Sequence, residues 1–97
     1  MTVVARTRRR DHVLRGRGTL MTQCLAAGLP VASACSGRGA CGKCLLTILD
    51  GADTLPPPSV REATVLARNG ADAGQRLGCQ CRMPHAGASL LVTTGYW

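Results

Sequence analysis

The chain contains six cysteines, and four of them have the spacing of metal ligands. Cys35, Cys41 and Cys44 lie in one short stretch, CSGRGACGKC, and Cys79 follows after a long interval. The pattern is Cys-x5-Cys-x2-Cys-x34-Cys. Three thiols on one loop can surround a metal centre when the fold brings a fourth thiol to that loop.

The same stretch cannot contribute to a packed core, because Gly, Ser and Ala have almost no side chain to bury. Gly37, Gly39 and Gly42 allow positive φ and let backbone N–H groups approach an anion closely. Arg38 and Lys43 add positive charge beside them. These features predict that the loop wraps a negatively charged group, which replaces the missing core.

The cysteine pattern and its surroundings resemble the plant-type [2Fe-2S] ferredoxins, and more closely their adrenodoxin-like branch, which has one more residue in the first gap. The resemblance covers essentially the whole chain: the leading hairpin, the segment GTLMTQCLAAG, the cysteine loop, and RLGCQC before the final strand. It implies a β-grasp fold and one-electron transfer. It also implies a [2Fe-2S] cluster bound by Cys35, Cys41, Cys44 and Cys79.

Other uses of the thiols stay open at this point. A structural zinc site usually draws on two close pairs; Cys79 and Cys81 are one residue too tight, although Cys81 and His85 could form a mixed pair. Free or disulfide-bonded thiols are a further alternative. Cys81 could also replace Cys79 as the fourth ligand, because two residues that are two apart on a strand point to the same face. We prefer Cys79, since RLGCQ matches the final-ligand motif of the family. Cys24 is expected to be a small buried hydrophobic residue of the first helix.

Apolar patterning and turn residues predict five strands and two helices. The expected strands are residues 2–7, 12–15, 44–51, 76–83 and 89–94. One helix should begin after an N-cap at Thr19 and stop at Gly28, and the other should open with a Ser59–Glu62 capping box and run to about Arg68. This order predicts an α+β fold as a single domain over residues 1–97. We expect a mixed sheet of four to five strands with a packed helix, in the β-grasp topology.

The net charge of +7 is concentrated near the N-terminus. Residues 1–17 contain six arginines and one aspartate, whereas residues 18–97 contain six basic and four acidic side chains. This cluster predicts either a docking surface for an acidic partner or an anionic membrane, or else a solvated hairpin that keeps the protein in solution. Nucleic acid is disfavoured, since no aromatic residues are interleaved with the arginines. No apolar run approaches the roughly 18 residues of a membrane span.

No catalytic constellation is visible: the sequence has no Ser-His-Asp set, phosphate loop or nucleotide fingerprint, so we expect neither an enzyme nor a small-molecule substrate. The first ten residues are too polar for a signal peptide, which predicts a cytoplasmic protein. In a reducing cytosol, cysteines are expected to be metal ligands or buried thiols in preference to disulfides. We expect a monomeric carrier that passes one electron from a reductase to an acceptor enzyme. The alternatives are a regulatory module whose cluster reports oxygen or redox state, and a zinc-binding interaction protein.

Overall fold

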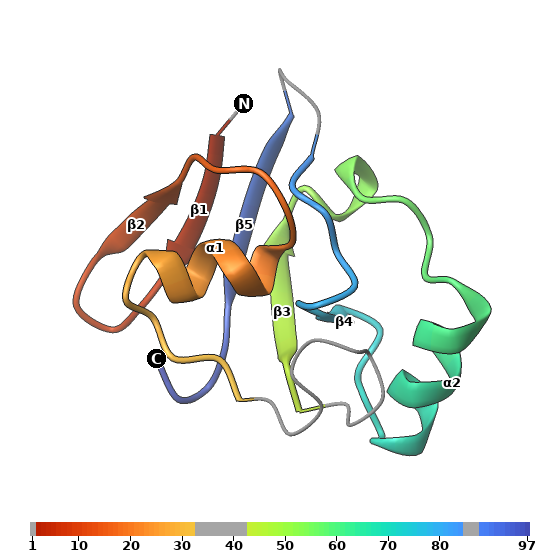
Figure 1. The fold of residues 1–97 in the computed structure, drawn as a ribbon. Helices are drawn as coiled ribbons and strands as arrows, with labels where there is room; N and C mark the ends of the chain where they lie inside the picture. The colour runs from red at the N-terminus through yellow and green to blue at the C-terminus, as the bar shows by residue number, and fades with distance from the viewer. Residues whose placement is uncertain (1, 33–42, 85–87) are drawn as a thin grey trace.

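The computed structural model describes residues 2–32, 43–84 and 88–97. The elements in chain order are β1 (Thr2–Arg6), β2 (Asp11–Leu14), α1 (Leu20–Ala26), β3 (Leu45–Asp50), a 3-10 turn η1 (Ala52–Thr54), α2 (Val60–Arg68), β4 (Gln75–Leu77) and β5 (Ser89–Thr93) (Figure 1). Within this described part, no helix has the length and apolar character needed to cross a bilayer.

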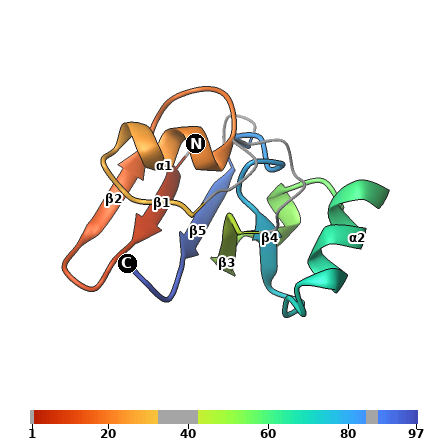
Figure 2. The same cartoon turned by 60° about the horizontal axis from the view of Figure 1, so that its bottom comes forward.

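The strands form one mixed sheet in the order β2-β1-β5-β3-β4. β1 and β5 run parallel, with Val3 opposite Leu90, and the other neighbouring pairs are antiparallel. Helix α1 crosses one face of the sheet, and α2 lies beside β4 at the edge of the molecule (Figures 1 and 2). The predicted α+β fold, a five-stranded mixed sheet with a packed helix, is confirmed.

The main hydrophobic core lies between α1 and the sheet. Alternate residues of the central strands face it, because successive side chains of a strand point to opposite faces. Leu20 and Cys24 contribute from α1, since residues four apart lie on the same side of a helix. The residues that face this core from β1, β5 and α1 are at most 2% exposed: Val3, Ala5, Leu90, Val92, Leu20 and Cys24. The expected burial of Cys24 is confirmed.

The two helix starts differ in how far they follow the prediction. Thr19 caps α1 as expected, and its hydroxyl accepts from the backbone N–H of Thr22 at 3.2 Å. Ser59 caps α2 in the same way, accepting from the N–H of Glu62 at 3.1 Å. The carboxylate of Glu62 does not return to Ser59, however, because it is hydrogen-bonded to Arg76 and to the backbone of Leu77. The reciprocal half of the predicted capping box is therefore wrong.

The strand predicted over residues 76–83 is also wrong beyond Leu77. The chain leaves β4 in a turn over residues 78–80, closed by the N–H of Gln80 donating to the carbonyl of Leu77 at 2.9 Å. The turn carries Cys79 and decides where that side chain lies.

Candidate metal centre

The structure brings two of the four predicted ligands together. The Sγ atoms of Cys44 and Cys79 lie 3.3 Å apart, and the two residues are 1% and 5% exposed. They belong to a small apolar cluster with Met21, Val65 and Leu77, separate from the main core. The other two predicted ligands, Cys35 and Cys41, fall outside the described residues.

Backbone pairing between β3 and β4 places the two thiols side by side. Leu45 and Leu77 face each other in the antiparallel register, so Cys44 and Gly78 lie just past the paired ends. The N–H of Gly78 donates to the carbonyl of Cys44 at 2.9 Å, which extends the pairing by one hydrogen bond. Cys79 follows directly, and its side chain reaches the thiol of Cys44.

Glycine at position 78 permits this close approach. A Cβ there would lie 2.9 Å from Cδ1 of Leu46 and 3.2 Å from the carbonyl oxygen of Cys44. Any larger residue would have to displace one of them. The glycine of RLGCQ therefore has a steric role next to the ligand.

Helix α1 holds the turn that carries Cys79. The first N–H groups of a helix have no partner within it, so they need acceptors from elsewhere. Here the N–H of Leu20 donates to the carbonyl of Cys81 at 2.8 Å, and the N–H of Met21 donates to the carbonyl of Gly78 at 3.0 Å. The helix thus packs across the sheet and also fixes the backbone on either side of Cys79.

A buried ion pair holds the turn from the other side. Glu62 of α2 is 2% exposed, and its carboxylate accepts from Nε and Nη2 of Arg76 at 2.7 and 2.9 Å. The same carboxylate accepts from the N–H of Leu77 at 3.1 Å, two residues before Cys79. The hydrogen bond to Glu62 is the main reason that the pKa of Arg76 is raised above its ordinary value.

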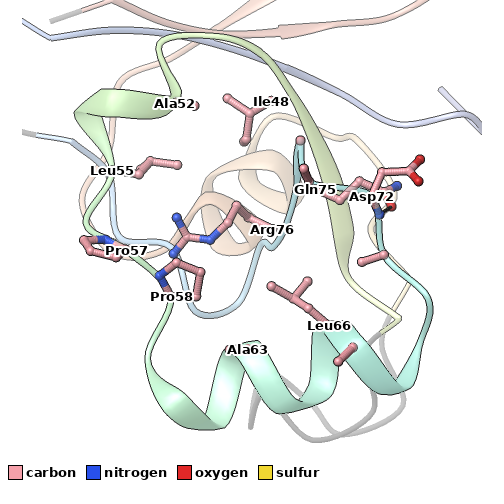
Figure 3. Close-up of a pocket in the computed structure, with 14 residues that line it drawn as sticks. Ile48, Ala52, Leu55, Pro57, Pro58, Ala63, Leu66, Asp72, Gln75 and Arg76 are labelled. Atoms are coloured by element: carbon pink, nitrogen blue, oxygen red, sulfur yellow. Dashed lines mark hydrogen bonds between the residues drawn. The ribbon is translucent and has the colours of Figure 1, made fainter.

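Arg76 also connects the turn to the proline-rich segment before α2. Its Nη1 donates to the carbonyl of Pro56 at 2.9 Å. Figure 3 shows its guanidinium near Pro57 and Pro58, at the edge of a cavity of about 480 Å³ between α2 and the end of β3. Sequence reasoning missed the Glu62–Arg76 pair, since no local spacing relates a helix residue to a strand residue that lies 14 positions later.

Cys81 lies in different surroundings from Cys79. It is 2% exposed and packs in the main core with Leu20 and Cys24. The expectation that Cys79 and Cys81 share one face of a strand is wrong, because the turn over residues 78–80 rotates the chain between them. Burial raises the pKa of Cys24 and that of Cys81 to about 12, so both are protonated thiols at neutral pH.

The donor pair fits a thiolate-bound metal cluster. A disulfide would bring the sulfurs to about 2.05 Å, whereas those of Cys44 and Cys79 lie 3.3 Å apart. Two thiolates that share a tetrahedral metal at about 2.3 Å from each lie roughly 3.8 Å apart. Within the described residues, no group of three His, Cys, Asp or Glu side chains could hold a metal ion. The remaining ligands would therefore have to come from residues outside the described ranges.

Comparison with curated proteins finds relatives among ferredoxins and within a larger reductase. A ferredoxin of Bacillus thermotolerans is 39% identical over 67 residues, covering 69% of this chain and 53% of that protein. The 2Fe-2S ferredoxin-5 of Aquifex aeolicus is 35% identical over 66 residues, covering 67% of this chain and 69% of that protein. One component of the Na(+)-translocating NADH-quinone reductase of Chlamydia pneumoniae is 30% identical over 67 residues, covering 69% of this chain. The chain spans only 15% of the length of that component.

Solved structures share the fold over nearly the whole chain. The ferredoxin of Trichomonas vaginalis superposes with a TM-score of 0.77 at 25% identity, covering 97% of this chain and 100% of that one. The ISC-like [2Fe-2S] ferredoxin of Pseudomonas putida superposes with a TM-score of 0.82 at 21% identity, covering 99% of this chain and 93% of that one. These likenesses agree with the β-grasp topology.

The sequence of residues 4–84 matches the family described as the 2Fe-2S iron-sulfur cluster binding domain. The matched span includes the cysteine loop, the paired thiols of Cys44 and Cys79, and the helix and ion pair that hold them. With the fold and the family in agreement, the chain belongs to the [2Fe-2S] ferredoxin-type cluster binding domains.

Proposed function

We propose that this chain is a one-electron carrier of the adrenodoxin-like branch of the plant-type ferredoxins. Cys35, Cys41, Cys44 and Cys79 would hold its [2Fe-2S] cluster. The observation that carries the proposal is the pair of buried thiols of Cys44 and Cys79, 3.3 Å apart at the joined ends of β3 and β4. When bound, the cluster supplies a redox centre that gains or loses one electron at a time.

The surrounding residues would keep this centre dry on its inner side and fixed in place. Met21, Val65 and Leu77 pack around the two thiols and exclude water from them. The hydrogen bonds from α1 and from Glu62 fix the backbone that carries Cys79, so that this ligand need not be ordered when the cluster binds. A preordered site changes little between the two redox states, which favours electron transfer.

The proposal extends to the partners and the setting of the protein. Putidaredoxin, with which this chain shares a fold at a TM-score of 0.76, forms a covalent complex with putidaredoxin reductase. By analogy, we infer that this chain receives electrons from a reductase and passes them to an acceptor enzyme, itself catalysing no reaction. We infer a monomer that works as a single domain over residues 1–97 in a reducing cytosol.

Metal and sulfide analysis of anaerobically purified protein tests this proposal. The expected result is two irons and two acid-labile sulfides per chain, with uptake of one electron at a potential on the order of −400 to −200 mV. Stoichiometric zinc without sulfide would refute it. If the cluster were instead lost in air together with a change in partner binding, the protein would be a sensor rather than a carrier.

A further inference from the structure

The arginine turn and the C-terminal aromatic residues meet across a groove of about 690 Å³. Figures 1 and 2 both show the turn between β1 and β2 near the C-terminus. We call this feature the basic groove; it is lined by residues 7–10, His12, residues 28–30, Tyr96 and Trp97. It lies outside the Cys44–Cys79 site and shares no lining residue with it.

One wall of the basic groove is a tight turn that presents three guanidinium groups. The hydroxyl of Thr7 accepts from the N–H groups of Arg9 and Arg10 at 3.3 and 3.2 Å, and the N–H of Thr7 donates to the carbonyl of Arg10 at 3.1 Å. These bonds depend on the backbone and on Thr7, so they leave the arginine side chains exposed. Arg8, Arg9 and Arg10 are all exposed.

No Asp or Glu side chain among the described residues forms an ion pair with this wall. The nearest acidic residue in sequence, Asp11, is engaged with Arg6, whose Nε lies 3.2 Å from its Oδ1. The lining of the groove includes no Asp or Glu at all. Arg8, Arg9 and Arg10 therefore line the groove without an Asp or Glu partner in the part of the chain that the structure describes.

The opposite wall is apolar and is fastened to the chain that leads to the cysteine loop. Nε1 of Trp97 donates to the carbonyl of Pro30 at 2.7 Å, and the N–H of Ala32 donates to the hydroxyl of Tyr96 at 3.0 Å. Trp97 is 9% exposed, whereas Tyr96 is 50% exposed and offers its ring to a ligand. Cys35 follows only three positions after Ala32.

We propose that the basic groove binds an extended acidic segment of a protein redox partner. Carboxylates of the segment would lie against Arg8, Arg9 and Arg10, and an apolar side chain would lie against Pro30 and the ring of Tyr96. Charge complementarity carries the proposal, because the groove is cationic on one side and apolar on the other. The proposal rests on the carrier function and deepens it by stating where the partner docks and what its docking segment contains.

Two other anionic ligands fit the groove less well. A phosphate site built from backbone N–H groups is disfavoured here, because those of Arg9 and Arg10 are already bonded to Thr7. A flat anionic bilayer cannot follow a groove, and membrane-surface binding needs an apolar face beside the cations. Tyr96 is the one large apolar residue of the lining that is markedly exposed among those the structure describes.

The experiment follows the indole N–H of Trp97, the single tryptophan of the chain, by two-dimensional NMR of the ¹⁵N-labelled holoprotein. The probe is a synthetic 12-residue peptide of alternating Glu and Ala with one central Phe. We expect a saturable shift of the indole signal at low salt, with a dissociation constant that rises as salt is added. No saturable shift at low salt would overturn the proposal.

Two variants that lose the same number of charges distinguish binding in the groove from attraction by the overall net charge. Replacing Arg8, Arg9 and Arg10 with Ser is expected to weaken peptide binding about tenfold, as a loss of several exposed charge pairs predicts. The control variant R15S/R17S/R61S removes the same number of charges outside the groove and is expected to change binding by about twofold or less. Equal weakening by both variants would show that only the overall charge attracts the peptide, and would overturn the proposal.

Competing probes and a redox measurement complete the test. Vesicles of phosphatidylserine and phosphatidylcholine, or ATP, that bind more tightly than the peptide and displace it would overturn the proposal in favour of a membrane or a phosphate ligand. Uptake of one electron from dithionite should be the same in both variants and the parent. If that uptake fails in the parent, the carrier function is refuted; if uptake succeeds and the peptide does not bind, only the basic groove is refuted.

Discussion

Replacing Glu62 with Gln should destabilise the protein through the turn that carries Cys79. The substitution keeps the size of the side chain and removes its charge. It leaves the guanidinium of Arg76 without a counter-charge. The carboxylate of Glu62 accepts three hydrogen bonds, and the substitution replaces one of its two oxygens with an NH₂ group, which cannot accept. The N–H of Leu77 loses a charged acceptor at the same time.

The expected loss of stability can be worked from the burial of the pair. Breaking a buried ion pair on one side costs about 3–5 kcal/mol. The side chain of Glu62 is 2% exposed but that of Arg76 is 13% exposed, and Arg76 keeps its bond to Pro56. We therefore expect a cost near the lower end, about 3 kcal/mol. With a urea slope of about 1.5 kcal/mol per M, the unfolding midpoint should fall by about 2 M.

Anaerobic urea titration of the holoprotein measures this change. Visible circular dichroism follows the cluster and far-ultraviolet circular dichroism follows the backbone. Midpoints are compared under conditions where both signals return on dilution of the urea, because the linear relation between free energy and urea requires reversible unfolding. The exposed Asp72 supplies a matched control, since Asp72→Asn removes the same charge near the end of α2 and should shift the midpoint by less than about 0.5 M.

A double substitution distinguishes the ion pair from a general effect of the mutation. If Glu62→Gln is combined with Arg76→Met, no buried charge is left unpaired, so the double variant should be more stable than Glu62→Gln alone. A midpoint for Glu62→Gln within about 0.3 M of the parent would refute the reasoning. So would a double variant less stable than the single one.

Three further predictions concern the cysteines and the glycine beside them. Cys79→Ser should lose the visible spectrum and bound iron while Cys81→Ser keeps both; the reverse result would make Cys81 the ligand. Burial raises the pKa of Cys24 from its ordinary value of 9.0 to about 12, so the folded state retains a thiol proton that the unfolded state loses, and stability from this group falls as the pH rises from 9 to 12. Cys24→Ala should therefore make the free energy of unfolding, obtained from urea titrations, fall less steeply at alkaline pH, by up to about 1.4 kcal/mol per pH unit. Parallel plots of this free energy against pH for the variant and the parent would contradict this. Gly78→Ala should shorten the half-life of the visible absorbance through a cost of about 1–3 kcal/mol, whereas Gly74→Ala, whose Cβ would meet only ordinary contacts, should not; equal half-lives would contradict the steric role.

A cysteine site could be predicted from the sequence because ligand chemistry is local, and the structure brings two of its four predicted members, Cys44 and Cys79, together. Three cysteines on one loop need no knowledge of the fold to be read as ligands, and the motif around Cys79 supplied the fourth. The strands were also predictable from apolar alternation, except at the end of β4. There the alternation of Leu77, Cys79, Cys81 and Met83 favours a strand, but the turn after Leu77 sends the two thiols into different clusters.

Features that depend on distant residues could not be predicted in this way. The Ser59–Glu62 spacing favours a reciprocal capping box, yet the partly buried guanidinium of Arg76 is a stronger partner for the carboxylate than a backbone N–H. The arginine turn and the aromatic C-terminus were each visible in the sequence. Their meeting across the basic groove was not, because the hydrogen bond from Trp97 to Pro30 spans 67 positions.

The position of β5 has a consequence for how the protein matures in the cell. β5 comes last among the strands, but it lies in the middle of the sheet, between β1 and β3. Before residues 89–93 leave the ribosome, the β1–β2 hairpin and the β3–β4 pair have no common strand to join them. The proposed ligand cysteines all precede β5, so they emerge from the ribosome while the sheet that will hold two of them in place is still in two halves. Assembly of the cluster should therefore follow synthesis of β5, and exposed thiols of the nascent protein must meanwhile be kept reduced.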